Sequence, residues 1–302
     1  MRSCTGGNVS LTTGDFRSKI TTQTLAEKKQ NGERITALTA YDYATARLVD
    51  ESGMDVVLVG DSLAQAMLGY ENTLPVTVDE MIHHTKAVRR AVKRAFLIAD
   101  MPFGSYHVSC REGLAHAARF VKEAGAEAVK IEGGEKRLEL ISKIIDAEIP
   151  VCGHIGLTPQ SVHMMGGYKV QGKTLKAVEQ LMRDAVALDR AGVCLLVLEG
   201  IPREVAAMIT REVHTPTIGI GAGPECDGQI LVFHDLVNLS FGPTPKFVRH
   251  YADAGTLIRD AVRDYCADVR SGAFPSDSES YHLPQETQEA LQIVTSRRTA
   301  RK

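Results

Sequence analysis

The stretch Gly-Met-Asp-Val-Val-Leu-Val-Gly-Asp, residues 53–61, runs from a glycine through an apolar segment to a carboxylate. Glycine is common just after the end of a helix, because it adopts a left-handed backbone without steric cost. The four consecutive apolar residues of Val56–Val59 are typical of a strand buried on both faces. The stretch therefore predicts a helix end, a buried strand, and an acidic side chain where that strand ends.

The same order of residues recurs at 125–132 (GAEAVKIE) and at 192–199 (GVCLLVLE). Short apolar runs also alternate with helical patterns along most of the chain, which indicates an α/β fold, a (β/α)₈ TIM barrel. The predicted strands are Ile35–Ala40, Val56–Val59, Phe96–Ala99, Ala128–Ile131, Val151–Ile155, Cys194–Leu198, Thr217–Ile220 and Leu236–Leu239. An open doubly wound sheet is the alternative, but no Gly-x-Gly-x-x-Gly follows the first run.

Helical patterns and composition define the expected boundaries. Apolar residues at three- and four-residue spacing predict helices over Asp79–Arg94 and Leu175–Ala191. A helix within Thr21–Gly32 is expected to close the floor of the barrel. We expect a flexible segment over 1–18, a single catalytic domain over 19–275 and a polar tail over 276–302; an organelle-targeting role for residues 1–18 is the alternative.

The composition excludes several classes of protein. The net charge is −2, with 35 basic and 37 acidic side chains, so no electrostatic feature favours nucleic acid or an anionic membrane as partner. The six cysteines are far apart and never form Cys-x-x-Cys, which predicts reduced thiols and a cytoplasmic protein. No apolar run approaches the ~18 residues of a membrane span.

Polar side chains follow most of the predicted strands, where a barrel places its active site. We refer to seven of them as the mouth residues: Asp61, Ser62, Asp100, Lys130, Glu132, His154 and Glu199. Each has an ordinary structural role open to it, as a helix cap, an ion-pair partner or a core histidine. Together they would bring four carboxylates to one place, where their mutual repulsion favours a bound divalent cation. A ligand set dominated by carboxylates suits Mg²⁺, or Mn²⁺ as a substitute.

Two glycine-rich stretches, Met165–Gly172 and Ile218–Gly223, are candidates for binding a phosphate through backbone N–H groups. The second follows the seventh predicted strand, where phosphate-binding barrels often place such a loop. Close packing at the edge of the barrel is the alternative explanation for these glycines.

Several strings together resemble the ketopantoate hydroxymethyltransferase family. They are TAYD (39–42), VGDS (59–62), ADMPFGSY (99–106), VKIEGG (129–134), CGHIGLTPQ (152–160), GGYKVQG (166–172), LVLEGIP (196–202) and TIGIGAGPECDGQILVFHD (217–235). The resemblance covers about Ile35 to Pro284 and implies a barrel of the phosphoenolpyruvate/pyruvate kind. Phe233 stands where many relatives have Trp, and Met164-Met165 replaces a more usual pair.

The resemblance also implies roles for single residues. Asp61, Asp100 and Glu132 resemble the Mg²⁺ ligands of the family. Asp61, Ser62, Asp100 and Lys130 match positions that contact an α-keto acid, His154 matches a further substrate contact, and Glu199 matches the proton acceptor. The family assembles as homo-oligomers, typically decamers.

The activity implied by the resemblance belongs to pantothenate (coenzyme A) biosynthesis. A hydroxymethyl group passes from 5,10-methylenetetrahydrofolate to 3-methyl-2-oxobutanoate through an enolate and gives 2-dehydropantoate. Two alternatives remain open at this stage. One is a Mg²⁺-dependent C–C lyase of the phosphoenolpyruvate/isocitrate-lyase kind on the same scaffold. The other is a non-catalytic barrel that serves as a scaffold or sensor.

Overall fold

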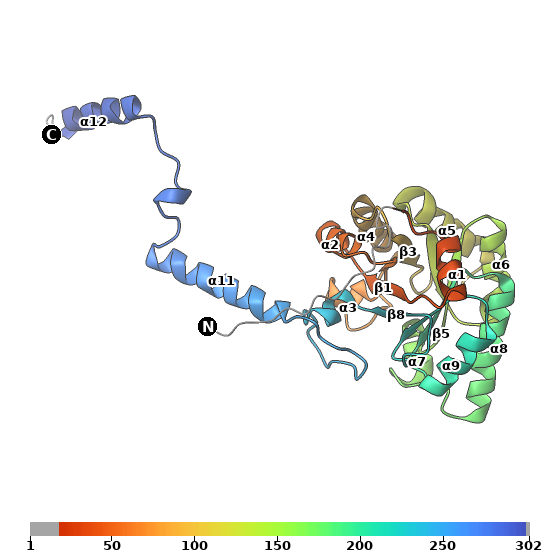
Figure 1. The fold of residues 1–302 in the computed structure, drawn as a ribbon. Helices are drawn as coiled ribbons and strands as arrows, with labels where there is room; N and C mark the ends of the chain where they lie inside the picture. Colours follow the sequence, from red (N-terminus) through yellow and green to blue (C-terminus); the bar gives the residue numbers. More distant parts are fainter. Residues whose placement is uncertain (1–17, 300–302) are drawn as a thin grey trace. The chain divides into compact units, whose positions relative to one another are not determined.

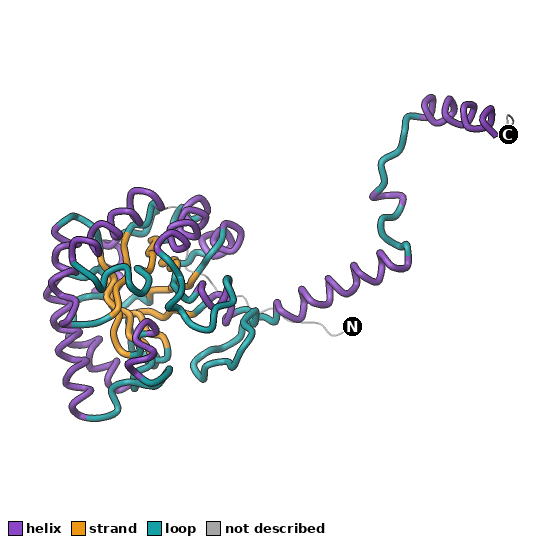
Figure 2. Tube along the Cα trace, turned by 180° about the vertical axis from the view of Figure 1, so that it is seen from behind, coloured by secondary structure: helices purple, strands orange, loops and turns teal. Residues whose placement is uncertain are grey.

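The computed structural model describes residues 18–299, which divide into two units at Tyr251 and Ala252. In the first unit, eight parallel strands pair in sequence order and close into a barrel, and helices surround the strands (Figure 1, Figure 2). The strands are β1 Ile35–Thr39, β2 Val56–Val59, β3 Phe96–Asp100, β4 Ala128–Glu132, β5 Val151–Gly156, β6 Leu195–Glu199, β7 Thr217–Ile220 and β8 Gly228–Leu231. The predicted barrel is confirmed.

Helices connect most of these strands. In the first unit they are α1 Thr22–Gln30, α2 Tyr43–Glu51, α3 Leu63–Ala66, α4 Val78–Ala91, α5 Cys110–Ala124, α6 Leu138–Asp146, α7 Val162–Met165, α8 Leu175–Ala191, α9 Arg203–Glu212 and α10 Phe233–Leu236, with the 3₁₀ turns η1 Glu135–Arg137 and η2 Pro159–Ser161. The predicted bounds of α8 are therefore correct. The glycines at 53, 125 and 192 all have positive φ, as expected after a helix.

The eighth strand was predicted in the wrong place. The apolar residues from Leu236 to Leu239 lie at the end of α10 and just after it, whereas β8 pairs with β1 through Gly228–Leu231. Gly228 is required there because a Cβ atom would lie 2.4 Å from the Ile35 carbonyl oxygen. A strand that begins with glycine and glutamine lacks the continuous apolar run used to find the others.

Helix α4 ends at Ala91, earlier than predicted. The buried carboxylate of Asp50 accepts hydrogen bonds from the backbone N–H groups of Lys93, Arg94 and Ala95, so these groups are satisfied outside a helix. The helix begins as expected, because Thr77 and Glu80 form a reciprocal capping box. At the start of α5, the Ser109 side chain likewise accepts from the backbone N–H of Glu112.

Strand residues alternate between the inside and the outside of the barrel. In β2, Val56 and Leu58 belong to an inner apolar cluster, while Val57 and Val59 pack in the outer cluster beneath the helices. Side chains from all eight strands supply the inner cluster. The apolar runs are continuous because both layers exclude water.

Helix α1 closes the amino-terminal end of the barrel, as predicted. Its Leu25 is fully buried within the inner cluster. Lys28 Nζ lies 3.1 Å from Asp55 Oδ2, and Lys29 Nζ lies 2.8 Å from Asp227 Oδ2. Because these two aspartates precede β2 and β8, the ion pairs attach the helix at the end of the barrel opposite the mouth residues.

The second unit contains α11 Ala254–Ser271, the short turn η3 Asp277–Glu279 and α12 Gln285–Thr299. Helix α12 lies in the segment expected to form a polar tail, and no helix was predicted there. The expected domain boundaries stay predictions, and the expectations for residues 1–17 lie outside the described residues. Within residues 18–299, no helix is long and apolar enough to cross a membrane.

We expect Leu25→Ala to lower the free energy of unfolding by about 2–5 kcal/mol, because it opens a cavity in the inner cluster. Urea titration measures the effect. The matched control is Leu48→Ala, since Leu48 is 61% exposed on α2. An equal, small effect of both substitutions would show that α1 is not part of the barrel core.

Candidate active site

The inner rows of apolar side chains continue into polar residues at the carboxyl ends of the strands. In β4, Ala128 belongs to the inner cluster, and Lys130 and Glu132 follow at two-residue spacing. By the same alternation, Ile98 leads to Asp100, Cys152 to His154, and Val197 to Glu199. Lys130 and Glu132 therefore point together into the barrel mouth.

Lys130 lies at the centre of the buried charges. Its Nζ is 3.1 Å from Asp100 Oδ1 and 4.0 Å from Glu132 Oε1, and it is 3.1 Å from His154 Nδ1. Burial alone would lower the pKa of Lys130, but Asp100 and Glu132 outweigh it and raise the pKa above its usual range. Lys130 therefore stays protonated and partly balances the surrounding carboxylates.

His154 connects Glu132 to Glu199. Its Nδ1 lies 3.5 Å from Glu132 Oε1, and its Nε2 lies 3.2 Å from Glu199 Oε2. Burial and Lys130 lower the pKa of His154, but the two glutamates reverse this and raise it to about 9. Protonated His154 can donate to both glutamates, whereas its contact with the Lys130 ammonium requires the neutral ring. The raised pKa favours the first arrangement.

Asp61 and Asp100 are held side by side. The backbone N–H of Asp61 donates to Asp100 Oδ2 at 2.9 Å. Burial raises the pKa of Asp61 well above its usual value, and Asp100 and Glu132 raise it further. Burial also raises the pKa of Asp100, although Lys130 opposes it. The site thus holds more negative charge than Lys130 and His154 comfortably balance.

Ser62 is not a helix cap. It occupies the position just before α3, but its side chain makes no capping hydrogen bond. Its hydroxyl instead lies 2.8 Å from the Tyr41 hydroxyl, and Tyr41 is itself buried at the end of β1. The capping alternative is therefore wrong for Ser62, whose hydroxyl is oriented by a tyrosine.

Sequence reasoning missed two residues of the site, Gln160 and Tyr106. Both are buried, and the Tyr106 hydroxyl donates to Gln160 Oε1 at 2.6 Å. Gln160 in turn contacts Asp61 and Glu132. Both residues belong to strings that carry the family resemblance, ADMPFGSY and CGHIGLTPQ, which was the one available signal. Neither follows directly from a strand, so strand periodicity could not find them.

The side chains present suit a hard divalent cation by their chemistry. Asp61, Asp100 and Glu132 offer carboxylate oxygens. Asp100 Oδ1 and Glu132 Oε1 are buried without a well-formed hydrogen bond, and they lie 3.1 Å from Lys130 Nζ and 3.5 Å from His154 Nδ1, respectively. Buried oxygens held by charge alone are rare in proteins. Within residues 18–299, however, no three His, Cys, Asp or Glu side chains already surround a common point as ligands. The donor set fits Mg²⁺, and its assignment to these three residues stays a prediction.

The second glycine-rich loop has a packing explanation. A Cβ atom at Gly219 would lie 2.9 Å from Cys226 Sγ, and one at Gly223 would lie 2.4 Å from Arg203 Cβ. These contacts account for the two glycines without a phosphate. In the first loop, burial and the charges of Asp61 and Glu199 raise the pKa of Tyr168, so this tyrosine lies within electrostatic reach of the mouth residues.

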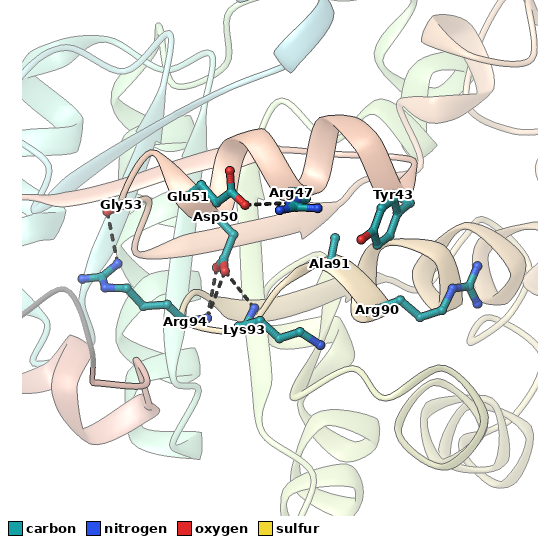
Figure 3. Close-up of a pocket in the computed structure, with 9 residues that line it drawn as sticks. All are labelled: Tyr43, Arg47, Asp50, Glu51, Gly53, Arg90, Ala91, Lys93 and Arg94. Atoms are coloured by element: carbon teal, nitrogen blue, oxygen red, sulfur yellow. Dashed lines mark hydrogen bonds and ion pairs between the residues drawn. The ribbon is translucent and has the colours of Figure 1, made fainter.

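A pocket of about 500 Å³ lies elsewhere, between α2 and α4 (Figure 3). It is lined by Tyr43, Arg47, Asp50, Glu51, Gly53, Arg90, Ala91, Lys93 and Arg94. Arg47 pairs with Glu51, and Arg94 donates to the Gly53 carbonyl. Because most of its charged groups serve local structure, we do not assign the chemistry to this pocket.

We expect Lys130→Met to lower the free energy of unfolding by about 3–5 kcal/mol in buffer with EDTA, because buried carboxylates lose their internal counter-charge. The matched control is Lys143→Met, which removes an exposed ion pair with Glu139 and should cost less than about 1 kcal/mol. Urea unfolding measures both. Equal losses would contradict a central role for the Lys130 charge.

The fold is shared with several solved enzymes. A phosphonopyruvate hydrolase in complex with oxalate and Mg²⁺ matches with a TM-score of 0.55 at 15% identity, covering 91% of this chain and 98% of that one. A 2,3-dimethylmalate lyase, of the PEP mutase/isocitrate lyase superfamily, matches with a TM-score of 0.54 at 17% identity, covering 92% and 97%. At these identities the likeness concerns the fold alone.

Sequence relatives are much closer. The chain is 70% identical over 292 residues to a 3-methyl-2-oxobutanoate hydroxymethyltransferase of Koribacter versatilis, covering 97% of this chain and 99% of that protein. It is 54% identical over 268 residues to the enzyme of the same name from a Thermoanaerobacter species, covering 89% and 98%. The profile of the ketopantoate hydroxymethyltransferase family matches residues 19–277. The chain belongs to the ketopantoate hydroxymethyltransferase family.

Proposed function

We propose that the protein transfers a hydroxymethyl group from 5,10-methylenetetrahydrofolate to 3-methyl-2-oxobutanoate, giving 2-dehydropantoate and tetrahydrofolate for pantothenate biosynthesis. Family membership and the names of its relatives support this activity. The observation that carries it is the buried chain of charges from Asp100 through Lys130, Glu132 and His154 to Glu199. Burying so many charged groups costs desolvation free energy, and such clusters are typical of functional sites.

In this proposal, Asp61, Asp100 and Glu132 hold Mg²⁺, with Mn²⁺ as a possible substitute. The cation supplies Lewis-acid polarisation of the substrate's keto oxygen. Asp100 Oδ1 and Glu132 Oε1 support these residues as ligands, because they are buried without a well-formed hydrogen bond and are met only by the charged groups of Lys130 and His154.

The other mouth residues orient the substrate. Ser62 and Lys130 bind the carboxylate of the keto acid, with Asp61 and Asp100 beside it. Lys130 is already protonated and fixed by its neighbours, so it can stabilise negative charge on the substrate without reorganising. His154 contacts the substrate side of the site and, through its 3.2 Å contact, orients the Glu199 carboxylate.

Glu199 removes the proton from C3 of the keto acid. The electrons of that C–H bond form the enolate, which attacks the methylene carbon of the folate and creates the new C–C bond. As the C–C bond forms, one C–N bond of the folate's methylene bridge breaks. A water molecule then supplies the hydroxyl group as the second C–N bond breaks. The proton taken from C3 and the remaining hydrogen of the water go to the two folate nitrogens, which gives tetrahydrofolate. Glu199 suits this role because it is the mouth carboxylate that keeps partial exposure, with 16% of its side chain accessible, so a substrate can reach it.

A C–C lyase on the same scaffold is less well supported. Such enzymes typically use a reactive cysteine, but Cys152 and Cys194 lie at the amino-terminal ends of β5 and β6. Burial raises the pKa of both thiols, so neither provides a thiolate at neutral pH. Product formation that depends on the folate would distinguish the transferase from a lyase. A purified protein that binds no Mg²⁺ in a titration would favour the non-catalytic barrel.

We further propose a cytoplasmic homo-oligomer, with the decamer as the form implied by the family. The described cysteines are all free, which supports a reducing compartment. Helix α11 carries an apolar stripe that comprises Ile258, Val262, Tyr265 and Val269, each between 46% and 56% exposed. A second copy of the chain is the natural partner for such a stripe.

The proposed base can be tested without folate. In D₂O with Mg²⁺ and 3-methyl-2-oxobutanoate, we expect the protein to exchange the C3 proton, as followed by NMR. Glu199→Gln should slow this exchange by roughly 100-fold or more, because general-base catalysis is lost. The control Glu139→Gln changes an exposed glutamate on α6 and should leave the rate unchanged. Exchange unaffected by Glu199→Gln would remove Glu199 as the base.

The oligomer can be tested at α11. We expect the double substitution Val262→Asp and Tyr265→Asp to reduce the molar mass measured by light scattering, because it introduces charge into the stripe. Arg263→Gln, on the same helix at 69% side-chain exposure, should leave the mass unchanged. An unchanged mass in the double variant would show that the stripe does not join copies of the chain.

A further inference from the structure

We propose that Gln160 is a positioning residue that determines which oxygens of Asp61 and Glu132 are presented to the divalent cation. The proposal rests on the metal centre proposed above and goes beyond it, because Gln160 itself is not among the predicted ligands. Gln160 belongs to the short turn η2 after β5, and its side chain is buried in the mouth of the barrel.

The side-chain amide of Gln160 uses both of its hydrogens as donors. Nε2 donates to Asp61 Oδ2 at 2.8 Å and to the Met101 carbonyl at 3.0 Å. Because Asp61 follows β2 and Met101 follows β3, one amide ties together the ends of two neighbouring strands. It also occupies one oxygen of the Asp61 carboxylate and leaves the other, Oδ1, for a ligand.

The orientation of this amide is itself fixed. Its Oε1 accepts from the Tyr106 hydroxyl at 2.6 Å, and the same hydroxyl accepts from the backbone N–H of Glu132 at 3.3 Å. Since Tyr106 has a single hydroxyl hydrogen and Glu132 is a donor here, that hydrogen goes to Gln160. A flipped amide would place Oε1 against Asp61 Oδ2 and the Met101 carbonyl oxygen, which can only accept, so the network allows one orientation.

The backbone of Gln160 likewise binds one carboxylate oxygen of Glu132. Its N–H donates to Glu132 Oε2 at 3.0 Å, while Glu132 Oε1 is buried without a hydrogen bond. One residue therefore holds one oxygen of each of two carboxylates, and the second oxygen of Glu132 is left to the charged cluster, 3.5 Å from His154 Nδ1. This is the arrangement expected of groups that orient metal ligands from outside.

A neutral donor suits this position better than a charged one. The Gln160 amide donates to Asp61 Oδ2 at 2.8 Å. Because the amide carries no charge, it orients the carboxylate without cancelling the negative charge that attracts a cation. A lysine or arginine there would add a second cation beside Lys130 and compete with the metal.

The test measures binding of Mn²⁺ alone to the purified full chain by electron paramagnetic resonance, without keto acid or folate. Gln160→Leu should weaken Mn²⁺ binding by about 10- to 100-fold, the range found for groups that orient metal ligands. Tyr106→Phe preserves the packing but releases the amide, and it should also weaken binding, by a smaller factor. The control Gln229→Leu alters an exposed glutamine that donates to the Gly223 carbonyl and should have no effect.

A second readout separates positioning from general damage. At saturating Mg²⁺ the Gln160→Leu protein should recover most of its C3 exchange rate, with a raised Mg²⁺ concentration at half-maximal rate. A permanent loss of rate at normal metal affinity would overturn the proposal. If Gln160→Leu does not fold, Tyr106→Phe decides the question, since unchanged Mn²⁺ affinity in that variant also overturns it.

The variant Asp61→Asn distinguishes the positioning role of Gln160 from the metal centre on which that role rests. Loss of Mn²⁺ binding in Asp61→Asn together with normal binding in Gln160→Leu would reject the role of Gln160 and leave the metal centre in place. Normal Mn²⁺ binding in Asp61→Asn would reject the metal centre itself and, with it, the positioning role.

Discussion

The alternation of side chains along closed parallel strands is the constraint on which the rest of this structure depends. In a barrel, every second side chain must enter a small shared interior. Over most of each strand that interior is apolar, as with Val56 and Leu58. At the carboxyl end the same rows continue into Asp100, Lys130 and His154, so charged groups meet there because the strands direct them to one place.

Charged side chains are paired differently at the two ends of the barrel. At the floor, Lys28 and Lys29 of α1 each pair with an aspartate at a strand's beginning, and these partly buried pairs attach a helix. At the mouth, four acidic side chains face Lys130 and His154, and two of their oxygens accept no hydrogen bond. The acidic groups at the floor are paired with lysines of α1, whereas the mouth keeps an excess of buried negative charge.

Much of the fold and of the site could be predicted from single stretches of sequence. Seven strands followed from apolar runs, and the acidic residue at the end of three of them followed from the recurring stretches at 53–61, 125–132 and 192–199. The eighth strand could not be found in this way, because Gly228 is selected by its close approach to the Ile35 carbonyl on β1. The alternative role of Ser62 as a helix cap was likewise settled only by the fold, because its hydroxyl contacts Tyr41, which follows β1.

The sequence by itself determined the repeated αβ unit, the carboxylate at the end of each unit and the family, since these depend on residues that are neighbours along the chain. Only the tertiary structure decided how those carboxylates are held. The amide of Gln160 contacts Asp61 across 99 positions of sequence, and His154 joins Glu132 to Glu199. The physical reason is that periodicity fixes the direction of a side chain, whereas a hydrogen bond depends on which strand ends and loops meet when the barrel closes.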